Sequence, residues 1–421
     1  MKYKVFGCKV NKYYTDEWLN SVYLSDKNGV FIASCVVTDK AKRKWLKFVR
    51  DELKTLKENE KIFISGCGAF EKGEENQAFF EVYEDLKWYE DKIEILPESP
   101  NQNKKEWNTP KADTPKLDLS AKLGGLKSIY TKKFIVIQWG CDSFCTFCLT
   151  VIKRGKHYYR SKEDIVDEIT DFEARGGKEV VLTWVNLCAW WLEHTNDFAN
   201  SKFAELLEYI LEKTEISRIR ISSLGPEFIN ERVLELFKNK RIYPHFHFSI
   251  QSGSSNVLKA MRRHYDGDYM RDLLEKTKNI QRDDGVEVSI WADLIVGFPN
   301  ESDEDFMQTL ELVEKYHITK LHAFPFSNHT LWEHVPASFF PHQVDEKIKK
   351  ERLDRLLLRG EEKRQEFIQT QIWRTFEVLI ESVKGSEWKG WSENYIECDQ
   401  NNFEVISGKI WKNEIVIGKL K

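Results

Sequence analysis

Residues 139–160 read WGCDSFCTFCLTVIKRGKHYYR and contain three cysteines in the spacing C-x₃-C-x₂-C. These cysteines are Cys141, Cys145 and Cys148, and Phe147 directly precedes the last of them. Three thiolates from one loop can hold a [4Fe–4S] cluster and leave one iron open to a small molecule, whereas four cysteines suit electron transfer. A zinc knuckle and three reduced core cysteines are the alternatives, although the C-x₃-C-x₂-C spacing as a whole differs from the C-x₂-C pairs of structural zinc sites.

The overall composition describes a globular protein of two or three domains. The 421 residues are 41% hydrophobic and 31% charged, as in soluble proteins. Because the chain has no membrane-length apolar run and starts without a signal-peptide pattern, we expect a cytoplasmic protein with no membrane partner. In a reducing compartment, its eight cysteines indicate metal binding or catalysis rather than disulfides. The net charge of −4 means that any RNA contact must come from local basic patches.

Residues 1–98 alternate short apolar runs with helical stretches, which predicts a small α/β domain. Three of these runs, KYKVFGC, GVFIASC and KIFISGC, each read as a strand followed by a cysteine. The cysteines are Cys8, Cys35 and Cys67. The carboxyl ends of parallel strands meet at one sheet edge, where open α/β sheets bind ligands. We therefore predict that the three thiols converge and could hold a second cluster; three ordinary buried cysteines are the alternative.

The remaining chain divides into three further parts. Residues 99–127 are polar, contain proline and lack an apolar period, which predicts a linker. Residues 128–365 repeat a strand–helix pattern, which predicts a partial parallel (β/α) barrel with the central cysteine loop at the active end of its first strand. Its strand candidates are FIVIQ, EVVLTWV, RIRISSL, HFHFSI, VSIWADLIV and KLHAFPF. Short strand patterns in residues 366–421 predict a small β-barrel of oligonucleotide-binding type.

The chain resembles the radical S-adenosylmethionine (SAM) methylthiotransferases, which modify tRNA or a ribosomal protein. Besides the central cysteine loop, the matching stretches are GCKVN (7–11), SC (34–35), SGC (65–67), RG (154–155), RS (160–161), RIRISSL (218–224), IQSGS (250–254), MRRHY (261–265), ADLIVGFP (292–299) and GWSENYI (390–396). GCKVN is most similar to the branch that acts on threonylcarbamoyladenosine in tRNA. The resemblance implies an α/β methylthiotransferase domain, a radical SAM partial barrel and a TRAM-like RNA-binding β domain.

The same resemblance implies a mechanism with two [4Fe–4S] clusters, one on the N-terminal and one on the central cysteines. The central cluster would cleave SAM to a 5′-deoxyadenosyl radical that activates the adenine C2–H. The N-terminal cluster would carry a sulfur that a second SAM methylates. Cofactors supply this chemistry because an aromatic C–H offers nothing to ordinary acid–base catalysis. The implied partners are the tRNA anticodon loop, an electron donor such as flavodoxin or ferredoxin, and a sulfur donor.

Further candidate site residues surround these motifs. Four are candidates for SAM binding, with core packing or polar networks as the alternative: Phe147, Ser222, Gln251 and Asp293. Basic side chains that could meet RNA phosphates are Arg154, Lys156, Arg160, Arg262 and Arg263. Aromatic side chains that could stack on loop bases are Tyr158, Tyr159 and His264. A solvated charged face is the alternative for the basic group.

Tryptophan stands at several positions where the family pattern has glycine. They are Trp184, Trp191, Trp291 and Trp373, with Trp332 less clear. The chain has 14 tryptophans and 21 glycines, whereas average usage would give about 29 glycines. We hypothesise that some of these tryptophans are UGA codons that the source organism reads as glycine. Genuine substitution with an altered SAM pocket is the alternative. Asn300 also falls at a glycine position, Cys188 falls near another, and Tyr14 replaces an acid.

Together these patterns favour a transferase that inserts a methylthio group at C2 of N6-threonylcarbamoyladenosine in tRNA. A methylthiotransferase for another modified adenosine or for a ribosomal protein is the second hypothesis. A non-catalytic RNA-binding relative with vestigial clusters is the third. Nucleoside analysis of tRNA separates the first two, and iron content with SAM cleavage identifies the third.

Overall fold

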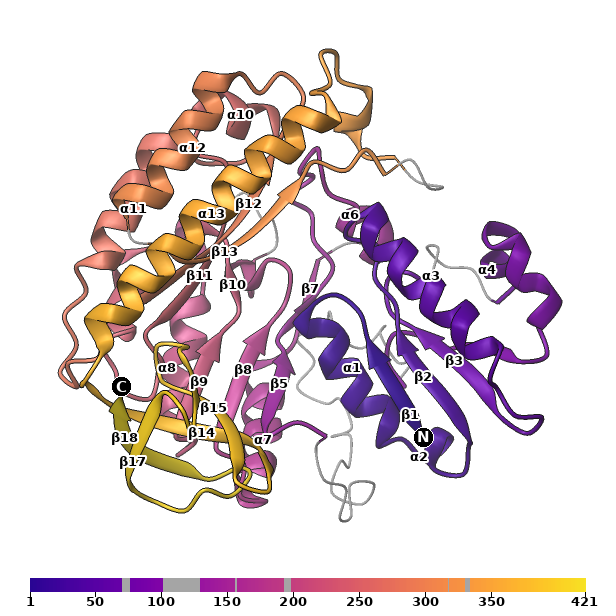
Figure 1. Ribbon diagram of the computed structural model, residues 1–421, viewed down its shortest axis with the longest axis horizontal. Coiled ribbons are helices and arrows are strands. Elements are labelled where there is room, and N and C mark those ends of the chain that lie inside the picture. Colours follow the sequence, from indigo (N-terminus) through magenta and orange to yellow (C-terminus); the bar gives the residue numbers. More distant parts are fainter. Residues whose placement is uncertain (70–75, 101–128, 156, 193–197, 317, 330–333) are drawn as a thin grey trace.

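The computed structural model describes residues 1–69, 76–100, 129–155, 157–192, 198–316, 318–329 and 334–421. Lys156, Trp332 and nearly all of the predicted linker at 99–127 lie outside these ranges. The described residues form an N-terminal parallel sheet, a central open sheet and a C-terminal antiparallel sheet, as Figure 1 shows. Among the described helices, none combines the length and apolar character that crossing a membrane requires.

The N-terminal sheet has four parallel strands in the order β1-β2-β3-β4. The strands are β1 (Lys2–Val5), β2 (Gly29–Ala33), β3 (Lys61–Ser65) and β4 (Ile93–Ile95). The connecting helices are α1 (Lys9–Leu19), α2 (Val22–Ser25), α3 (Asp39–Leu53), α4 (Asn76–Val82) and η1 (Glu84–Tyr89). The three predicted strands are confirmed, and the short strand β4 is an addition.

Alternation along β2 and β3 gives this sheet two apolar faces. Phe31 and Phe63 pack with the apolar residues of α1 and join the core of the central sheet. Ile32 and Ile64 point to the opposite face and pack with Trp45 of α3. Helix α1 therefore lies between the N-terminal sheet and β5 (Lys132–Val136) of the central sheet, which sets the two cysteine-bearing regions side by side (Figure 1).

The central region is an open, curved parallel sheet. Its strands after β5 are β8 (Glu179–Thr183), β9 (Arg218–Ile221), β10 (Ser223–Leu224), β11 (His245–Gln251), β12 (Ser289–Val296) and β13 (Ile318–Pro325). The helices are α7 (Lys162–Ala174), α8 (Phe203–Lys213), α9 (Glu231–Leu236), α10 (Ser255–Ala260), α11 (Gly267–Lys278), α12 (Asp303–Lys315) and α13 (Glu346–Gln371). Strands β9 and β10 are separated only by Ser222, so the two groups of strands continue one another. This arrangement confirms the predicted partial (β/α) barrel, with α10 to α13 on its outside (Figure 1).

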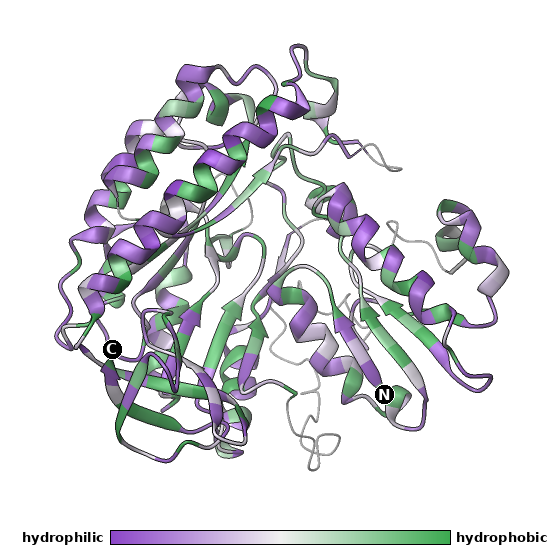
Figure 2. Ribbon diagram, viewed as in Figure 1, coloured by the Kyte–Doolittle hydropathy of each residue, from purple (hydrophilic) through white to green (hydrophobic). Residues whose placement is uncertain are grey.

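Short elements complete the central region. Beside the cysteine loop lie β6 (Gln138–Trp139), α6 (Thr150–Arg154) and β7 (Tyr158–Tyr159), and the 3₁₀ turns are η3 (Leu187–Ala189), η4 (Phe198–Asn200), η5 (Pro226–Phe228) and η6 (Pro336–Phe339). Figure 2 shows that β2, β3 and β8 are mostly hydrophobic, whereas α13 is mostly hydrophilic. The strands therefore supply the core, and the outer helices carry the polar surface.

The C-terminal region is a curled five-stranded antiparallel sheet in the order β16-β15-β14-β18-β17. The strands are β14 (Thr375–Lys384), β15 (Glu387–Trp391), β16 (Glu397–Asp399), β17 (Phe403–Ser407) and β18 (Ile415–Leu420). The predicted small β structure is confirmed, with β15 as a strand that the pattern EWKGW did not reveal. Gly390 interrupts that pattern because an added Cβ would lie 2.5 Å from the Leu379 carbonyl oxygen across the sheet.

A buried ion-pair group joins the central and C-terminal sheets. The Glu179 carboxylate pairs with Arg218 and Arg220, each at 2.8 Å. Both guanidiniums then donate to backbone carbonyls of the GWSENYI stretch, at Trp391 (3.0 Å) and Ser392 (2.7 Å). The stretches RIRISSL and GWSENYI are therefore contact partners that hold two regions of the fold together.

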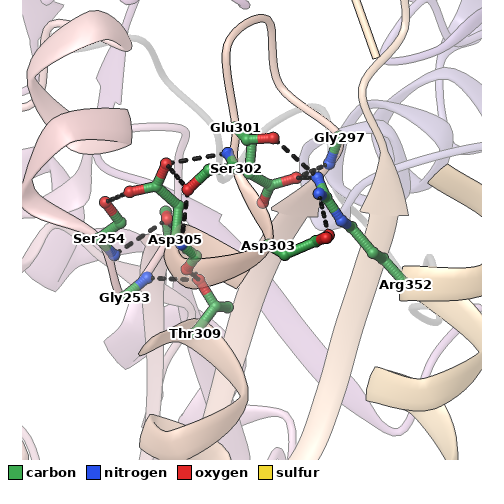
Figure 3. Close-up of polar contacts among 10 residues, drawn as sticks. Gly253, Ser254, Gly297, Glu301, Ser302, Asp303, Asp305, Thr309 and Arg352 are labelled. Atoms are coloured by element: carbon green, nitrogen blue, oxygen red, sulfur yellow. Dashed lines mark hydrogen bonds and ion pairs between the residues drawn. The ribbon is translucent and has the colours of Figure 1, made fainter. Parts of the chain in front are cut away.

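A second polar group fixes the loop after β12 to α13, as Figure 3 shows. The backbone N–H of Gly297 donates to the Glu301 carboxylate, which Arg352 of α13 also pairs with at 2.8 Å. Arg352 reaches Asp303 at 2.7 Å as well, and Ser302 forms a capping box at the start of α12. This network positions the carboxyl end of β12, the strand that carries Asp293.

Candidate active site

The three N-terminal cysteines converge at the carboxyl edge of their sheet. Cys8, Cys35 and Cys67 follow β1, β2 and β3, the Cys35 and Cys67 side chains are hydrogen-bonded, and the charge of Cys67 acts on Cys8. Gly7 makes this approach possible because it has φ +88° and an added Cβ would lie 2.4 Å from Cys35 Sγ. The strand-then-cysteine pattern thus gathers three sulfurs in one place.

Side-chain hydrogen bonds tie the three strand ends together. Asn11, the last residue of GCKVN, is 1% exposed, and its Nδ2 donates to the carbonyls of Phe6 (2.6 Å) and Ser34 (2.7 Å). Ser34 Oγ in turn donates to the Ser65 carbonyl at 2.6 Å. The polar residues of these stretches therefore position the backbone that carries the thiols.

The central cysteines are held in a loop that is bonded on several sides. The backbone N–H of Cys141 donates to the Gly155 carbonyl (3.2 Å), and that of Cys148 donates to Cys145 (3.1 Å). Thr146 Oγ1 donates to the Ala260 carbonyl at 2.9 Å. The three thiols lie close enough for their charges to interact, and burial raises the pKa of Cys141 to about 12 and also raises that of Cys148. A bound cation is what would hold such buried sulfurs as thiolates.

Each cysteine group has a buried guanidinium beside it. Arg154 of α6 pairs with Glu98 at 2.9 Å, and its charge acts on both Cys8 and Cys67. The pKa of Cys67 is lowered to about 5, first by its hydrogen bond with Cys35 and then by Arg154. Within the described residues, the buried Nη1 of Arg154 has no hydrogen-bond partner. The N-terminal sulfurs therefore face a cation with an unused donor.

Arg263 has the corresponding place at the central group. Its Nη1 donates to Cys145 Sγ at 3.3 Å, and its Nη2 pairs with Glu227 at 3.3 Å. Its Nε donates to the Tyr265 hydroxyl, which donates to the Ser249 and Ile250 carbonyls. The MRRHY stretch thus supports the cysteine loop. Both groups fit an iron–sulfur cluster, because three soft thiolates meet one compensating cation in each.

The predicted phosphate contacts are contradicted for three of the arginines. Arg154 and Arg263 are directed at the cysteines, and Arg160 pairs with Glu168 at 2.7 Å. These charges are neutralised inside the fold, so they are not available on the surface. Arg262 is exposed, as is His264, whereas Tyr158 and Tyr159 are half-buried. Arg262 is the predicted phosphate-binding residue that the described surface still presents.

The predicted SAM-binding residues occupy two environments. Phe147 is half-buried, directly precedes Cys148 and packs against the apolar cluster that contains Cys67 and Leu149. Gln251 ends β11 with φ +71°. Ser222 is buried, and its Oγ has no partner within the described ranges. The structure thus leaves the polar atom of Ser222 available to a ligand.

Asp293 belongs to a network of histidines that the sequence reading missed. Its Oδ1 contacts His247 Nε2 at 2.7 Å and His322 Nδ1 at 3.2 Å, and its Oδ2 accepts from Ser223 Oγ at 3.2 Å. Burial acts to raise the pKa of Asp293, but the charges and hydrogen bonds of the two imidazoles outweigh it and lower that pKa. Alternation in HFHFSI and KLHAFPF was the available signal, since it puts these histidines on the inner face.

The space beside Asp293 is aromatic and basic. Trp291 packs against His245 (4.6 Å between ring centroids) and Tyr395 (4.6 Å). Both ring nitrogens of His245 are buried without a partner among the described residues. Burial lowers the pKa values of His245 and His247, and the charge of Lys9, directly after Cys8, also acts to lower them. Sequence reasoning did not identify Lys9 as a site residue.

Two of the unusual tryptophans occupy backbone positions that favour glycine. Trp190 has φ −55° and ψ 133°, Trp191 has φ +65°, and Leu192 N–H donates to the Ala189 carbonyl. These are the features of a type II β-turn, whose third residue requires positive φ and is usually glycine. Trp373 repeats them: Ile372 has φ −58° and ψ 137°, Trp373 has φ +66°, and Arg374 donates to Gln371.

The other two described tryptophans are explained by packing. Trp184 is 2% exposed, packs against the ring of Trp139 and donates from Nε1 to the Gly140 carbonyl at 2.7 Å. Trp291 fills the barrel interior, and neither residue has a positive φ. Asn300, by contrast, has φ +66°, a conformation that asparagine tolerates. Cys188 and Cys398 are buried in the cores of their regions.

Comparisons with known proteins agree with this geometry. Residues 135–313 match the family model of the radical SAM superfamily. The chain is 33% identical over 410 residues to a threonylcarbamoyladenosine tRNA methylthiotransferase of Thermotoga maritima, with 94% of this chain and 90% of that relative covered. It is 29% identical over 438 residues to a tRNA-2-methylthio-N(6)-dimethylallyladenosine synthase of Bacillus subtilis, with 98% and 79% covered.

Among solved structures, the radical SAM methyltransferase TsrM of Kitasatospora setae aligns with a TM-score of 0.47 at 12% identity, covering 74% of this chain and 67% of its own.

A further sequence relative, the threonylcarbamoyladenosine tRNA methylthiotransferase of Rickettsia prowazekii, is 31% identical over 427 residues, with 98% of this chain and 93% of that relative covered. The chain therefore belongs to the radical SAM methylthiotransferases, a family of transferases, and resembles the threonylcarbamoyladenosine tRNA branch in particular.

Proposed function

We propose that this protein inserts a methylthio group at C2 of N6-threonylcarbamoyladenosine next to the tRNA anticodon, using SAM and two [4Fe–4S] clusters. One observation carries the proposal: Arg154 lies in the short helix that follows the central cysteine loop, and its charge acts on Cys8 and Cys67. The two cysteine groups are therefore neighbours across α6. A sulfur carrier and a radical source that act on one base have to be neighbours in this way.

The residues of the chain have distinct tasks in this proposal. When bound, the clusters and SAM would supply one-electron chemistry and the transferred sulfur. The N-terminal and central cysteines would hold the clusters, and Arg154 and Arg263 would offset the thiolate charge. Val36, Phe298 and Phe326 form an apolar cluster with Cys67 and Leu149, which would exclude water from the reaction space. Gln251, Ser222 and Phe147 would contact SAM from the barrel side.

Binding of tRNA would use the exposed faces around the site. Arg262 would contact phosphates, and His264, beside it and also exposed, would stack on a loop base. The C-terminal sheet would add a TRAM-like RNA surface. An electron donor of the flavodoxin or ferredoxin type and a sulfur donor would complete the reaction in the cytoplasm.

The test compares tRNA nucleosides from a deletion strain with those from complemented strains. Loss of 2-methylthio-N6-threonylcarbamoyladenosine in the deletion strain, with return on complementation by the wild-type gene, is the expected result. Complementation with Cys8→Ala or Cys141→Ala should fail. In anaerobically reconstituted protein, each of these variants should lose about half of the iron, because each disrupts one of two clusters.

Different outcomes identify the alternatives. Loss of a methylthio group from dimethylallyladenosine would move the protein to the other tRNA branch. If the deletion strain has unchanged tRNA but a ribosomal protein that lacks its methylthio group, that protein is the substrate. If the wild-type protein holds no iron and releases no 5′-deoxyadenosine from SAM, the enzymatic proposal fails.

A further inference from the structure

Lys9 is a cation without an ion-pair partner among the described residues, and it lies at the boundary of the two regions that form the proposed site. It is the first residue of α1, directly after Cys8, and its side chain is half-buried. In the described part of the chain, no group accepts a hydrogen bond from its ammonium and no carboxylate lies within 4.0 Å of it. Partial burial of an ammonium costs free energy because it removes water from the charge, and here no partner compensates for that loss.

The neighbouring charges of the interior are already matched. Lys132 pairs with Glu381 at 2.6 Å, Arg220 pairs with Glu179 at 2.8 Å, and the Asp293 carboxylate is held by His247 and His322. An anion that enters this interior would therefore find Lys9 as its free cationic partner. Within the described residues, Lys12 and Lys320 are also half-buried without an ion pair, but their ammonium groups lie over the rings of Phe134 (5.3 Å) and Trp291 (4.3 Å).

The surrounding side chains fit a polar substituent that carries such an anion. His245 is 1% exposed, and both of its ring nitrogens lack a partner among the described residues. Trp291 and Tyr395 flank it with aromatic faces. This combination offers hydrogen bonds to carbonyl or hydroxyl groups next to the Lys9 ammonium. An apolar substituent would leave both the ammonium and the imidazole unpaired, which is unfavourable.

We propose that Lys9 is a specificity residue that receives the carboxylate of the substituent on the target adenosine. This inference rests on the proposed function, since threonylcarbamoyladenosine carries a carboxylate and dimethylallyladenosine does not. Its position beside Cys8 would place that carboxylate at the sulfur-carrying side of the site. A backbone phosphate is the other source of an anion for Lys9, and the experiment separates the two.

The experiment measures binding of anticodon stem-loop RNAs by fluorescence anisotropy. Three RNAs differ only at the target base: threonylcarbamoyladenosine, its carboxamide, in which the carboxylate is neutral, and unmodified adenosine. Lys9→Gln should weaken binding of the first RNA by about 10-fold or more and leave the other two within about 2-fold, because a hydrogen bond to a charged group is lost. Lys9→Arg should keep most of the wild-type preference. The three RNAs are titrated against the same preparation of each variant. Loss of a cluster in that preparation would therefore change all three affinities equally.

Lys12→Gln is the matched control, three residues further along α1. Its ammonium lies over the rings of Tyr130 (5.7 Å) and Phe134 (5.3 Å), so its loss should leave all three affinities unchanged. If Lys9→Gln weakens all three RNAs by one factor, Lys9 faces a phosphate and the proposal is overturned. Equal binding of wild type and Lys9→Gln to every RNA also overturns it. If the wild-type enzyme methylthiolates dimethylallyladenosine instead, the proposed function fails first, independently of the Lys9 variants.

Discussion

Replacing Trp373 by glycine should stabilise the protein relative to replacing it by alanine. Trp373 is 66% exposed and has φ +66° at the third position of a type II turn. Both replacements lose the same few indole contacts, so their difference isolates the backbone. The left-handed conformation costs a residue with a Cβ about 1–2 kcal/mol. Glycine avoids this strain but loses about 0.5–1 kcal/mol more conformational entropy on folding, because its unfolded chain is more flexible. The glycine variant should therefore be more stable by about 0.5–1 kcal/mol.

Trp411 provides the control because it is similarly exposed, at 64%, and does not have a positive φ. There the order should invert, with Trp411→Gly less stable than Trp411→Ala by about 0.5–1 kcal/mol. Urea unfolding followed by far-ultraviolet circular dichroism measures all four variants under one condition. The reasoning is refuted if Trp373→Gly is no more stable than Trp373→Ala, or if both positions respond with the same sign.

Three other predictions concern the gene, the buried ion pairs and the central cluster. Protein isolated from the source organism should give peptides with the mass of glycine at Trp191 and Trp373, and UGG codons at these positions would reject the recoding hypothesis. Glu179→Gln should destabilise the fold by about 3 kcal/mol near pH 7. Burial acts to raise the pKa of Glu179, but the charges of Arg220, Arg218 and Lys132 outweigh it and lower that pKa from 4.5 to about 2. That deficit should be complete above pH 4.5 and shrink as the pH falls towards 2, whereas Glu397→Gln, which breaks an exposed pair, should cost less than about 1 kcal/mol at any pH. In reconstituted protein, Arg263→Gln should lower the reduction potential of the central cluster, because a cation beside Cys145 favours the added electron; electron paramagnetic resonance titration would contradict this if exposed Arg262→Gln gave an equal shift.

The tryptophans at glycine positions fall into two groups that only the structure separates. Composition and family pattern pointed to five tryptophans together. The backbone separated them: Trp191 and Trp373 stand where positive φ favours glycine, whereas Trp184 and Trp291 are packed in the interior with ordinary φ. Sequence patterns cannot make this distinction, because the sign of φ depends on the turn that the flanking elements impose.

The sequence by itself determined the features that depend on local spacing. The C-x₃-C-x₂-C loop, the three strand-then-cysteine stretches and the strand–helix alternation were all readable because periodicity and chain order fix them. The domain boundaries at 98, 127 and 365 stay predictions from the same patterns.

The tertiary structure decided which charges are used inside the protein. Arg154 and Arg263 looked like surface phosphate ligands in the sequence, yet the fold turns both towards cysteines, and Cys145 lies 118 residues from Arg263 in the chain. Lys9 looked like one of many lysines, and only the packing of α1 against β5 brings it to the histidines of the barrel. A charge takes its partner from whatever the fold places within a few ångströms, and local sequence carries no record of that distance.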